Sequence, residues 1–332
     1  MSPKVVVTNW VHPEVLEVLA PHCRVEANDG CEPWPEQELL ARCADARAMM
    51  AFMPDRVDEG FLAACPDLGI VACALKGFDN FDVAACTRRG VWVTVVPDLL
   101  TEPTAELAVG HLIALGRNMP AGDRAVRKGF AGWRPRLYGA GLDGSVVGIL
   151  GAGRVGSAIA ERLQGFGCAA ILYADLEALD PERESALGMG RVDFEELLGA
   201  SDFLVVAAPL NRDTRHLVDA GALGRMKPGC RLVNISRGSV VDEGAVAAAL
   251  EAGTLAGYAA DVFELEDWAL DDRPVDIPAG LLDARDKTFF TPHLGSAVDR
   301  VRVEIGLRAA DAIVQYLRGE RPDGAVNDPT PS

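Results

Sequence analysis

Basic side chains are scarce in this chain of 332 residues. Lysine and arginine together number 32 against 49 aspartates and glutamates, which gives a formal net charge of −17 at pH 7. So acidic a protein repels phosphate backbones, and nucleic acid is therefore not an expected partner. A small anionic ligand would need a locally cationic site in order to bind.

Paired cysteines and long apolar runs are absent as well. The eight cysteines include no CxxC pair, and no histidine–cysteine cluster has zinc-ligand spacing, so we expect reduced thiols and no metal. No apolar run reaches the ~18 residues that cross a bilayer. The segment MSPKVVVTNW has the pattern of a short strand and lacks the features of a secretion signal. These absences favour a cytoplasmic protein with no membrane partner.

Short apolar segments alternate with helical ones along most of the chain, whose length fits two domains. The expected strands are KVVVTN, AMMAFM, LGIVACAL, GVWVTVV, SVVGILG, AAILYAD, DFLVVAA, CRLVNIS, AGYAADV and KTFFTP. Continuous apolar strands separated by helices are typical of parallel sheets that are covered on both faces. The sequence therefore predicts an α/β protein with doubly wound parallel sheets.

Several helix boundaries are also predicted. Asp193 and Asp242 have the position of N-caps, and one long helix is expected from about Pro103 to Val126. The last helix should bury a stripe at helical period. Its members are Val298, Val301, Ile305, Ala309, Ala312 and Ile313. The final segment, RPDGAVNDPTPS, is expected to be loosely held.

The segment VVGILGAGRVGSAIAERLQGFG has the glycine pattern of a dinucleotide-binding turn. Gly151, Gly153 and Gly156 follow an apolar strand and precede a helix, where they allow a tight turn and close approach of a pyrophosphate. The next strand ends in Asp175, which can accept hydrogen bonds from the adenosine ribose. Asp175 would repel a 2′-phosphate, and Leu176 offers no compensating cation. NAD is therefore favoured over NADP.

One of the five histidines lies where chemistry is expected. His293 follows an apolar strand, and ligands of open α/β sheets bind at such carboxyl-end loops. Arg237 and an acidic segment, FELED, follow two other strands in the same way. These residue types could clamp an anion, orient an imidazole and move a proton. The other histidines are assigned solvated or packing roles: His12, His22, His111 and His216.

Taken together, these segments resemble the D-isomer-specific 2-hydroxyacid dehydrogenase family. The similarity rests on GILGAGRVG, PLNRDTRHLV, LVNISRGSVVDE, AADVFELED and TPHLGS, in family order over nearly the whole chain. It implies that Arg237, Glu266 and His293 are catalytic, with Glu266 rather than Glu264 as the acid. The positions matching the family's cofactor-binding residues are Thr104, Gly151, Gly153, Arg154, Val155, Gly156, Asp175, Pro209, Ile235, Asp261 and His293.

The resemblance also implies a domain organisation. Residues 1–99 and 295–332 would form a discontinuous, flavodoxin-like substrate domain, and residues 100–294 a Rossmann domain that binds NAD. The substrate would bind in a cleft between them. Family members are usually homodimers.

Within the family, the similarity is greatest to members that oxidise phosphite. It extends to AMMAFMPDRVD, CALKGFDNFDV, GWRPRLYGAGLD and EDWALDDRP. Their pattern implies a substrate pocket. Two of its aromatic residues, Trp133 and Tyr138, would come from the same chain or from the partner subunit. Its residues are Met53, Lys76, Gly77, Trp133, Tyr138 and Arg237.

Lys76 directly follows the buried segment LGIVACAL, where a hydrated lysine is rarely placed without a partner. A second cation beside Arg237 would favour a dianion such as phosphite, whereas the alternative is a lysine that merely extends to solvent. The sequence therefore favours NAD-dependent oxidation of phosphite to phosphate. Two other functions remain open: an NAD-dependent dehydrogenase of D-2-hydroxy acids or reductase of 2-keto acids, and an NAD-sensing scaffold.

Overall fold

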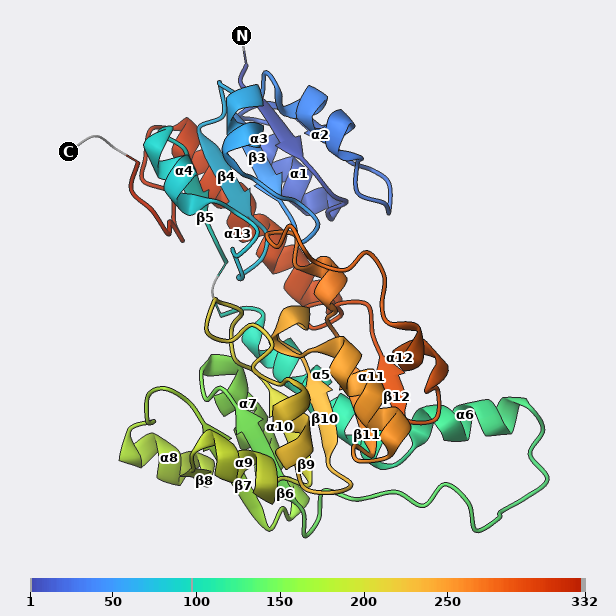
Figure 1. Ribbon diagram of the computed structural model, residues 1–332. Helices are drawn as coiled ribbons and strands as arrows, with labels where there is room; N and C mark the ends of the chain where they lie inside the picture. Colours follow the sequence, from blue (N-terminus) through green and yellow to red (C-terminus); the bar gives the residue numbers. More distant parts are fainter. Residues whose placement is uncertain (1, 97, 330–332) are drawn as a thin grey trace. The chain divides into compact units, whose positions relative to one another are not determined.

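The computed structural model describes residues 2–96 and 98–329 and divides into two compact units, each with its own sheet (Figure 1). Unit 1 comprises Met1–Leu100, Trp268–Asp271 and Ser296–Ser332. Unit 2 comprises Thr101–Asp267 and Asp272–Gly295. The last helix of the chain therefore belongs to unit 1.

Unit 1 is built on a parallel sheet with the order β2-β1-β3-β4-β5. This is the order of a flavodoxin-like, doubly wound sheet, as predicted. Its strands are β1 (Lys4–Val7), β2 (Arg24–Ala27), β3 (Ala48–Ala51), β4 (Ile70–Cys73) and β5 (Trp92–Thr94).

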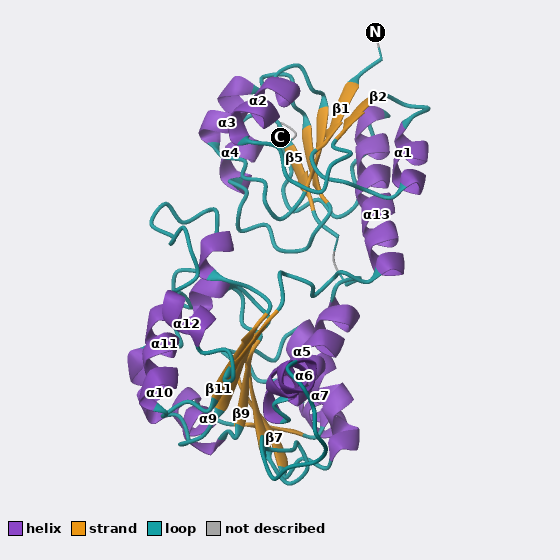
Figure 2. Ribbon diagram, turned by 90° about the vertical axis from the view of Figure 1, so that its right-hand side faces the viewer, coloured by secondary structure: helices purple, strands orange, loops and turns teal. Residues whose placement is uncertain are grey.

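Helices cover both faces of this sheet. Figure 2 shows α1 and α13 on one side and α2, α3 and α4 on the other, and a separate apolar core fills each side. The helices are α1 (Pro13–Leu19), α2 (Glu36–Cys43), α3 (Glu59–Ala64), α4 (Val83–Arg88) and α13 (Asp299–Leu317).

Unit 2 is built on a parallel sheet with the order β12-β11-β10-β9-β6-β7-β8. Numbered within the unit, this order is the Rossmann arrangement 3-2-1-4-5-6 with one further strand. Its strands are β6 (Val146–Leu150), β7 (Ala170–Ala174), β8 (Met189–Arg191), β9 (Phe203–Val206), β10 (Arg231–Asn234), β11 (Gly257–Ala260) and β12 (Thr288–Phe290). The predicted fold class is thus confirmed for both sheets.

The sheet of unit 2 also lies between two helical layers, which Figure 2 shows edge-on. Helices α5 and α7 enclose one core, and α9, α10, α11 and α12 enclose the other. The α-helices are α5 (Thr101–Gly116), α6 (Met119–Arg127), α7 (Arg154–Leu163), α8 (Pro181–Leu187), α9 (Phe194–Ala200), α10 (Ala220–Arg225), α11 (Glu243–Ala252) and α12 (Ala279–Asp283). Single turns of 3-10 helix are η1 (Gln164–Phe166), η2 (Gly238–Val240) and η3 (Glu264–Glu266). None of the described helices is long and apolar enough to cross a membrane.

All ten predicted strands form, and two short ones were missed. Strand β2 has the sequence RVEA and none of its residues is fully buried, so it lacks an apolar run. Strand β8 has only three residues, MGR. Both pair at an end of the sheet order, where fewer contacts constrain the sequence.

The predicted N-caps are confirmed, because Asp193 accepts from the amide of Glu196 at 2.8 Å and Asp242 caps α11. The prediction of a single helix from about Pro103 to Val126 is wrong. It is divided into α5 and α6 by Asn118, whose φ of 51° is left-handed. An asparagine tolerates this conformation better than most residues do.

Two expectations for the C-terminal part need correction. Val298 precedes α13 and is 37% exposed, so the buried stripe begins at Val301. The segment after α13 is also not loose as far as it is described. Val326 donates to the carbonyl of Val93 at 2.9 Å, and Asn327 accepts from the Val93 amide at 2.8 Å. Residues 330–332 of that segment lie outside the described chain.

Candidate functional site

The strand register of unit 2 aligns the ends of neighbouring strands at one edge of the sheet. Leu150 pairs with Ala174 and Val206, and Asn234 pairs with Val206 and Ala260. Strand β12 continues the series, since its last residue, Phe290, pairs with Ala260. The residues that follow these strands therefore emerge at the same level, and they include the dinucleotide turn, the ribose acid and each predicted catalytic loop.

The glycine turn is shaped for a phosphate. Gly151 has a φ of 97°, and a Cβ there would lie 2.7 Å from the amide nitrogen of Ala208. A Cβ on Gly156 would lie 2.0 Å from the carbonyl oxygen of Gly151, so the helix packs directly on the turn. No atom lies within 4 Å of a Cβ on Gly153, at the N-terminus of α7. The backbone there is open to a pyrophosphate, and the residues fit the cofactor.

Asp175 follows β7 and is tied to this turn. Its Oδ2 accepts from the amide of Ala152 at 2.7 Å. The structure adds a cation that sequence reasoning missed, because Arg191 of β8 donates to the carbonyls of Asp175 and Leu176 at 3.0 and 3.2 Å. Pairing of β7 with β8 places the arginine there, and no local sequence pattern reports it. Leu176 itself is 96% exposed.

We expect Asp175→Asn to increase the use of NADP. The amide keeps an acceptor for Ala152 but removes the charge that repels a 2′-phosphate, while Arg191 remains. The kcat/KM for NADP should rise by about tenfold or more, since removing ~1.4 kcal/mol of repulsion has that effect. Steady-state kinetics with both cofactors measures it. Adding Arg191→Ala should reverse the gain; if it does not, Arg191 is not the cation involved.

His293 and Glu266 form a close pair. The Nδ1 of His293 lies 2.7 Å from Oε2 of Glu266, while Oε1 of Glu266 accepts from the amide of Phe263 at 2.8 Å. Both carboxylate oxygens are thus used, which fixes the acid and the ring it holds. The Nε2 of His293 is left available for a proton, and the side chain is 26% exposed.

The backbone of His293 is held in a left-handed conformation, with a φ of 55°. Its amide donates to the carbonyl of Asp261 at 2.8 Å. The Asp261 carboxylate accepts from the amides of Leu294 at 2.6 Å and Gly295 at 2.8 Å. This loop is therefore wrapped around a buried carboxylate, and burial raises the pKa of Asp261.

Arg237 follows β10 on a loop that packs against the loop of Glu266. The carbonyl of Arg237 accepts from Nδ2 of Asn234 at 2.9 Å, and its guanidinium donates to the carbonyl of Ser236 at 2.9 Å. The next residue, Gly238, lies so near that a Cβ would be 1.9 Å from the carbonyl carbon of Phe263. The loops that carry Arg237 and Glu266, two predicted catalytic residues, are therefore packed directly on each other.

His216 was assigned a solvated or packing role, and it has a specific partner. Its Nε2 lies 2.7 Å from Oε2 of Glu264. The Glu264 carboxylate accepts from the amide of Glu243 at 3.0 Å, and the Glu243 carboxylate accepts from the amide of Glu264 at 2.9 Å. The geometry therefore separates the two acids of the FELED segment, since Glu266 contacts His293 and Glu264 contacts His216.

Unit 1 carries three of the predicted substrate residues, Met53, Lys76 and Gly77, at the carboxyl edge of its sheet. Met53 follows β3 and half-buried Lys76 follows β4. The two loops are joined, because Nδ2 of Asn80 donates to the carbonyl of Met53 at 3.1 Å. The Met53 loop is also fixed by buried Asp55, which accepts from Thr8 and from the amide of Phe52 at 2.7 Å. Gly77 lies directly after Lys76.

Arg302 is a cation of unit 1 that sequence reasoning missed. It donates to the carbonyl of Ala74 and to Oγ of Ser296, both at 3.4 Å, and its guanidinium lies 5.8 Å from the ring centre of Phe52. No carboxylate of the described residues lies within ion-pair distance of it. Burial lowers the pKa of Arg302. No local pattern of the sequence predicts these contacts, since only the fold brings α13 to the end of β4.

Trp133 and Tyr138 lie on the segment that follows α6, and each is 75% exposed. Figure 1 shows this segment as a long loop that extends from the body of unit 2. Asn118 holds its far end by donating to the carbonyls of Leu137 and Tyr138, both at 3.2 Å. The predicted pocket role of the two aromatic residues stays a prediction.

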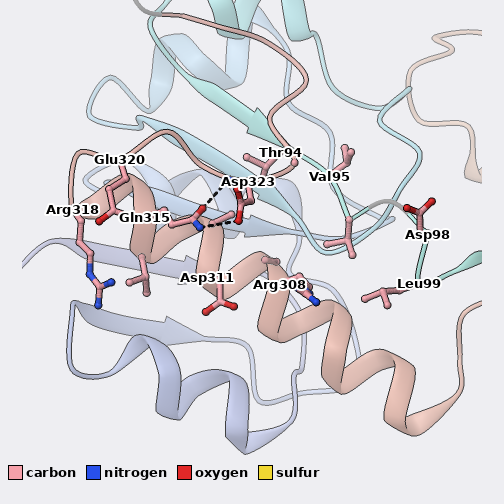
Figure 3. Close-up of a pocket in the computed structure, with 15 residues that line it drawn as sticks. Thr94, Val95, Asp98, Leu99, Arg308, Asp311, Gln315, Arg318, Glu320 and Asp323 are labelled. Atoms are coloured by element: carbon pink, nitrogen blue, oxygen red, sulfur yellow. Dashed lines mark hydrogen bonds between the residues drawn. The ribbon is translucent and has the colours of Figure 1, made fainter.

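A cavity of about 510 Å³ lies in unit 1 between the end of β5 and the second half of α13 (Figure 3). Arg308, Asp311 and Gln315 line it from the helix, and Gln315 bonds Asp323 at 2.9 Å. Its described lining includes none of the predicted site residues. The walls mix acidic and basic side chains and do not define one ligand chemistry.

The strand order, the glycine turn and the carboxylate after β7 together define a dinucleotide-binding oxidoreductase. The family model for the NAD-binding domain of D-isomer specific 2-hydroxyacid dehydrogenases matches residues 109–295. The chain belongs to this family, and its cofactor is NAD(P).

Individual relatives cover nearly the whole chain. A glyoxylate reductase of Aeropyrum pernix is 38% identical over 331 residues, which span 98% of this chain and 96% of its own. The crystal structure of the TT0316 protein of Thermus thermophilus matches with a TM-score of 0.88 at 31% identity, covering 98% of this chain and 100% of that one. An NADPH-dependent glyoxylate/hydroxypyruvate reductase of Sinorhizobium meliloti, solved with NADP and malonate, has a TM-score of 0.83 at 30% identity, covering 98% and 97%.

Proposed function

We propose that the protein is an NAD-dependent dehydrogenase that interconverts a small 2-hydroxy acid and the corresponding 2-keto acid, with glyoxylate as the first candidate. The observation that carries this proposal is the His293–Glu266 pair at 2.7 Å, placed at the strand ends of a cofactor-binding sheet. The names of the whole-length relatives support the choice of keto acid over the phosphite that sequence analysis favoured.

The residues act in complementary ways. Arg237 binds the substrate carboxylate, because a guanidinium matches a planar carboxylate in geometry and charge. His293, oriented by Glu266, gives a proton to the keto oxygen in reduction and takes it from the hydroxyl in oxidation. When bound, the nicotinamide supplies the donor or acceptor of hydride. Asp261 holds the loop that presents His293.

Phosphite oxidation is the second candidate, and the cations of unit 1 favour it. Lys76 and Arg302 both lie at the end of β4, so unit 1 alone presents two cations there. Two unit charges about 4 Å apart attract by about 4 kcal/mol at an effective dielectric of ~20. A dianion doubles each attraction, while repulsion among the cations is unchanged. In this candidate His293 deprotonates the water that attacks phosphorus. The P–O bond forms as the P–H bond breaks, and bound NAD would take up the hydride, so that phosphite is converted to phosphate.

A substrate panel tests both candidates. NADH consumption is measured with glyoxylate and hydroxypyruvate, and NADH formation with phosphite, D-lactate and D-glycerate. The highest kcat/KM with glyoxylate is the expected result. A clear preference for phosphite overturns it and establishes the second candidate. Absence of turnover on the whole panel, with NADH still bound, overturns both in favour of an NAD-sensing scaffold.

Lys76→Met separates the two substrate classes at one residue. Methionine keeps the length of the side chain and removes its charge. We expect kcat/KM to fall by about 10²-fold for a dianionic substrate and by less than about tenfold for a monocarboxylate, because the lost attraction scales with ligand charge. Lys76→Arg is the matched control and should retain most activity. Equal losses in kcat/KM on both substrates would show that Lys76 does not distinguish ligands by their charge.

We also propose that the protein is a homodimer in which the 119–138 arm packs on a second copy. The arm concentrates large apolar side chains that are between 46% and 75% exposed. They are Met119, Val126, Phe130, Trp133, Leu137 and Tyr138. An arm of this kind would carry its aromatic residues into the partner, which is one of the two arrangements that the resemblance allows for Trp133 and Tyr138.

The oligomeric state checks this proposal. We expect a dimer by analytical ultracentrifugation, and the double variant Phe130→Asp/Trp133→Asp should weaken it by about 10²-fold or more, as buried aromatic anchors do. Val275→Asp is the control, because Val275 is 85% exposed and lies outside the arm. A monomeric wild-type protein, or a dimer that survives the double variant, contradicts the proposal.

A further inference from the structure

A chain of hydrogen bonds runs from helix α5 to the loop of His293, entirely within unit 2. The Nε2 of His111 lies 3.0 Å from Oγ1 of Thr291, and that hydroxyl donates to Oδ1 of Asp261 at 2.5 Å. The Asp261 carboxylate then accepts from the amides of Leu294 and Gly295. His111 is buried, and none of the mechanistic steps above uses it.

We propose that His111 is a positioning residue, which fixes the 291–295 loop and the His293 imidazole through Thr291 and Asp261. The inference rests on the assignment of His293 as the proton-transfer group, and it does not depend on which substrate is used. It adds to the site a residue that lies on a helix and reaches the reacting groups only through two others.

The direction of the hydrogen bonds follows from counting protons. A threonine hydroxyl has one proton. Its contact with the Asp261 carboxylate is short, and that carboxylate also accepts hydrogen bonds from two amides, so Thr291 donates its proton to Asp261. Thr291 must then accept from His111, so the imidazole carries its proton on Nε2. Its Nδ1 has no partner among the described residues, as expected for the unprotonated nitrogen.

The His111 imidazole is neutral near pH 7. Burial lowers the pKa of His111 to about 4, so it acts as a fixed donor that does not change charge near neutral pH. The edge of its ring also contacts Phe289 of β12, with ring centres 5.0 Å apart. His111 is therefore held from two sides in the orientation that serves Thr291.

The loop is held by the ionised form of Asp261, because the ionised carboxylate accepts the hydrogen bonds from Thr291, Leu294 and Gly295. Burial raises the pKa of Asp261, and the donors oppose that rise. The titratable groups that face it are His111 of α5, which reaches it through Thr291, and His293 after β12, whose amide donates to the Asp261 carbonyl. Removing the His111 donor weakens Thr291 as a donor, which raises the pKa of Asp261 further.

His111→Leu tests the proposal against His111→Gln. Leucine fills the space without a donor, whereas the glutamine amide can still donate to Thr291. We expect the acid limb of the kcat/KM profile to move up by about one pH unit in the leucine variant, with kcat reduced by about tenfold or less, and to return in the glutamine variant. A leucine variant with the wild-type limb, or a glutamine variant as impaired as leucine, overturns the proposal.

Thr291→Val and Thr291→Ser provide the second arm. Valine breaks the chain in its middle and should shift the acid limb at least as far, while serine keeps the hydroxyl and should not. In the Thr291→Val background, His111→Leu should cause no further shift. A full additional shift there would mean that His111 acts by packing alone, which overturns the proposal. These threonine variants decide the question even if His111→Leu does not fold.

The pH dependence of NADH binding, followed by nicotinamide fluorescence, is measured on the same variants. It needs no substrate, so a failure of the glyoxylate proposal leaves this test intact. The same limb should move in the binding profile of His111→Leu, since the clamped loop borders the cofactor-binding strand ends. A binding limb that stays fixed in every variant contradicts the proposed role.

Discussion

Replacing His293 with asparagine should lower kcat by about 10²–10⁴-fold, because general acid–base catalysis contributes that much and the described residues 291–295 hold no other titratable side chain. NADH should still bind, since the glycine turn and Asp175 lie after other strands. Asparagine is chosen because it tolerates the left-handed backbone that His293 adopts, with a φ of 55°. Single-turnover measurements separate the loss in chemistry from any loss in binding.

A second histidine offers a matched control for this experiment. His216 also has a left-handed backbone, with a φ of 50°, and its ring is also 2.7 Å from a glutamate. Its partner is Glu264, which is bound to the backbone of α11. His216→Asn should therefore reduce kcat by less than about tenfold, the effect of one lost hydrogen bond. Equal losses in the two variants would mean that His293 supports the loop and does not move the proton.

The residues that follow the strands were predictable because both local signals coincide there. An apolar run marks the strand, and a polar residue within three positions of its end marks the edge where ligands bind. Asp175, Arg237 and His293 all satisfy both conditions. Their meeting at one level then depends on the parallel register, in which the last residues of neighbouring strands pair.

The missed residues lack such a signal. Arg191 lies in a three-residue strand that sequence analysis missed, and Arg302 lies in a helix whose sequence indicates only a buried stripe. Each acquires its neighbours through long-range packing, of β8 on β7 and of α13 on β4. His111 is hidden in the same way, because its partner Thr291 is 180 residues away along the chain. The contacts of such side chains depend on the tertiary fold, and the local sequence pattern does not predict them.

The end of α5 at Gly116 is a helix boundary that the sequence did not predict. The sequence predicts that α5 and α6 form one helix, yet Asn118 adopts a left-handed conformation and redirects the chain. The reason lies in packing, since a Cβ on Gly139 would be 2.0 Å from the carbonyl oxygen of Gly116 and Nδ2 of Asn118 bonds the segment around it. The return of the arm therefore decides where the helix stops.

The second large effect is expected from a single methyl group, in Gly238→Ala. A Cβ at this position would lie 1.9 Å from the carbonyl carbon of Phe263, 2.1 Å from the amide nitrogen of Glu264 and 2.3 Å from the Phe263 carbonyl oxygen. These neighbours are backbone atoms and cannot rotate away, so one of the two loops must move. Overpacking of this kind costs about 1–3 kcal/mol or more in the free energy of unfolding.

The displaced loops carry Arg237 on one side and Glu266 on the other, so the main consequence of Gly238→Ala should be catalytic. A shift of ~1 Å in such groups costs about 10²-fold in rate, and we expect kcat/KM to fall by at least that factor. Gly224→Ala in α10 is the matched control, because nothing lies within 4 Å of its Cβ and alanine favours a helix. Thermal unfolding and kinetics of both variants separate the two effects. If Gly238→Ala keeps full activity while the protein is destabilised, the contact between the loops serves stability alone, and Arg237 and Glu266 are positioned by their own strands.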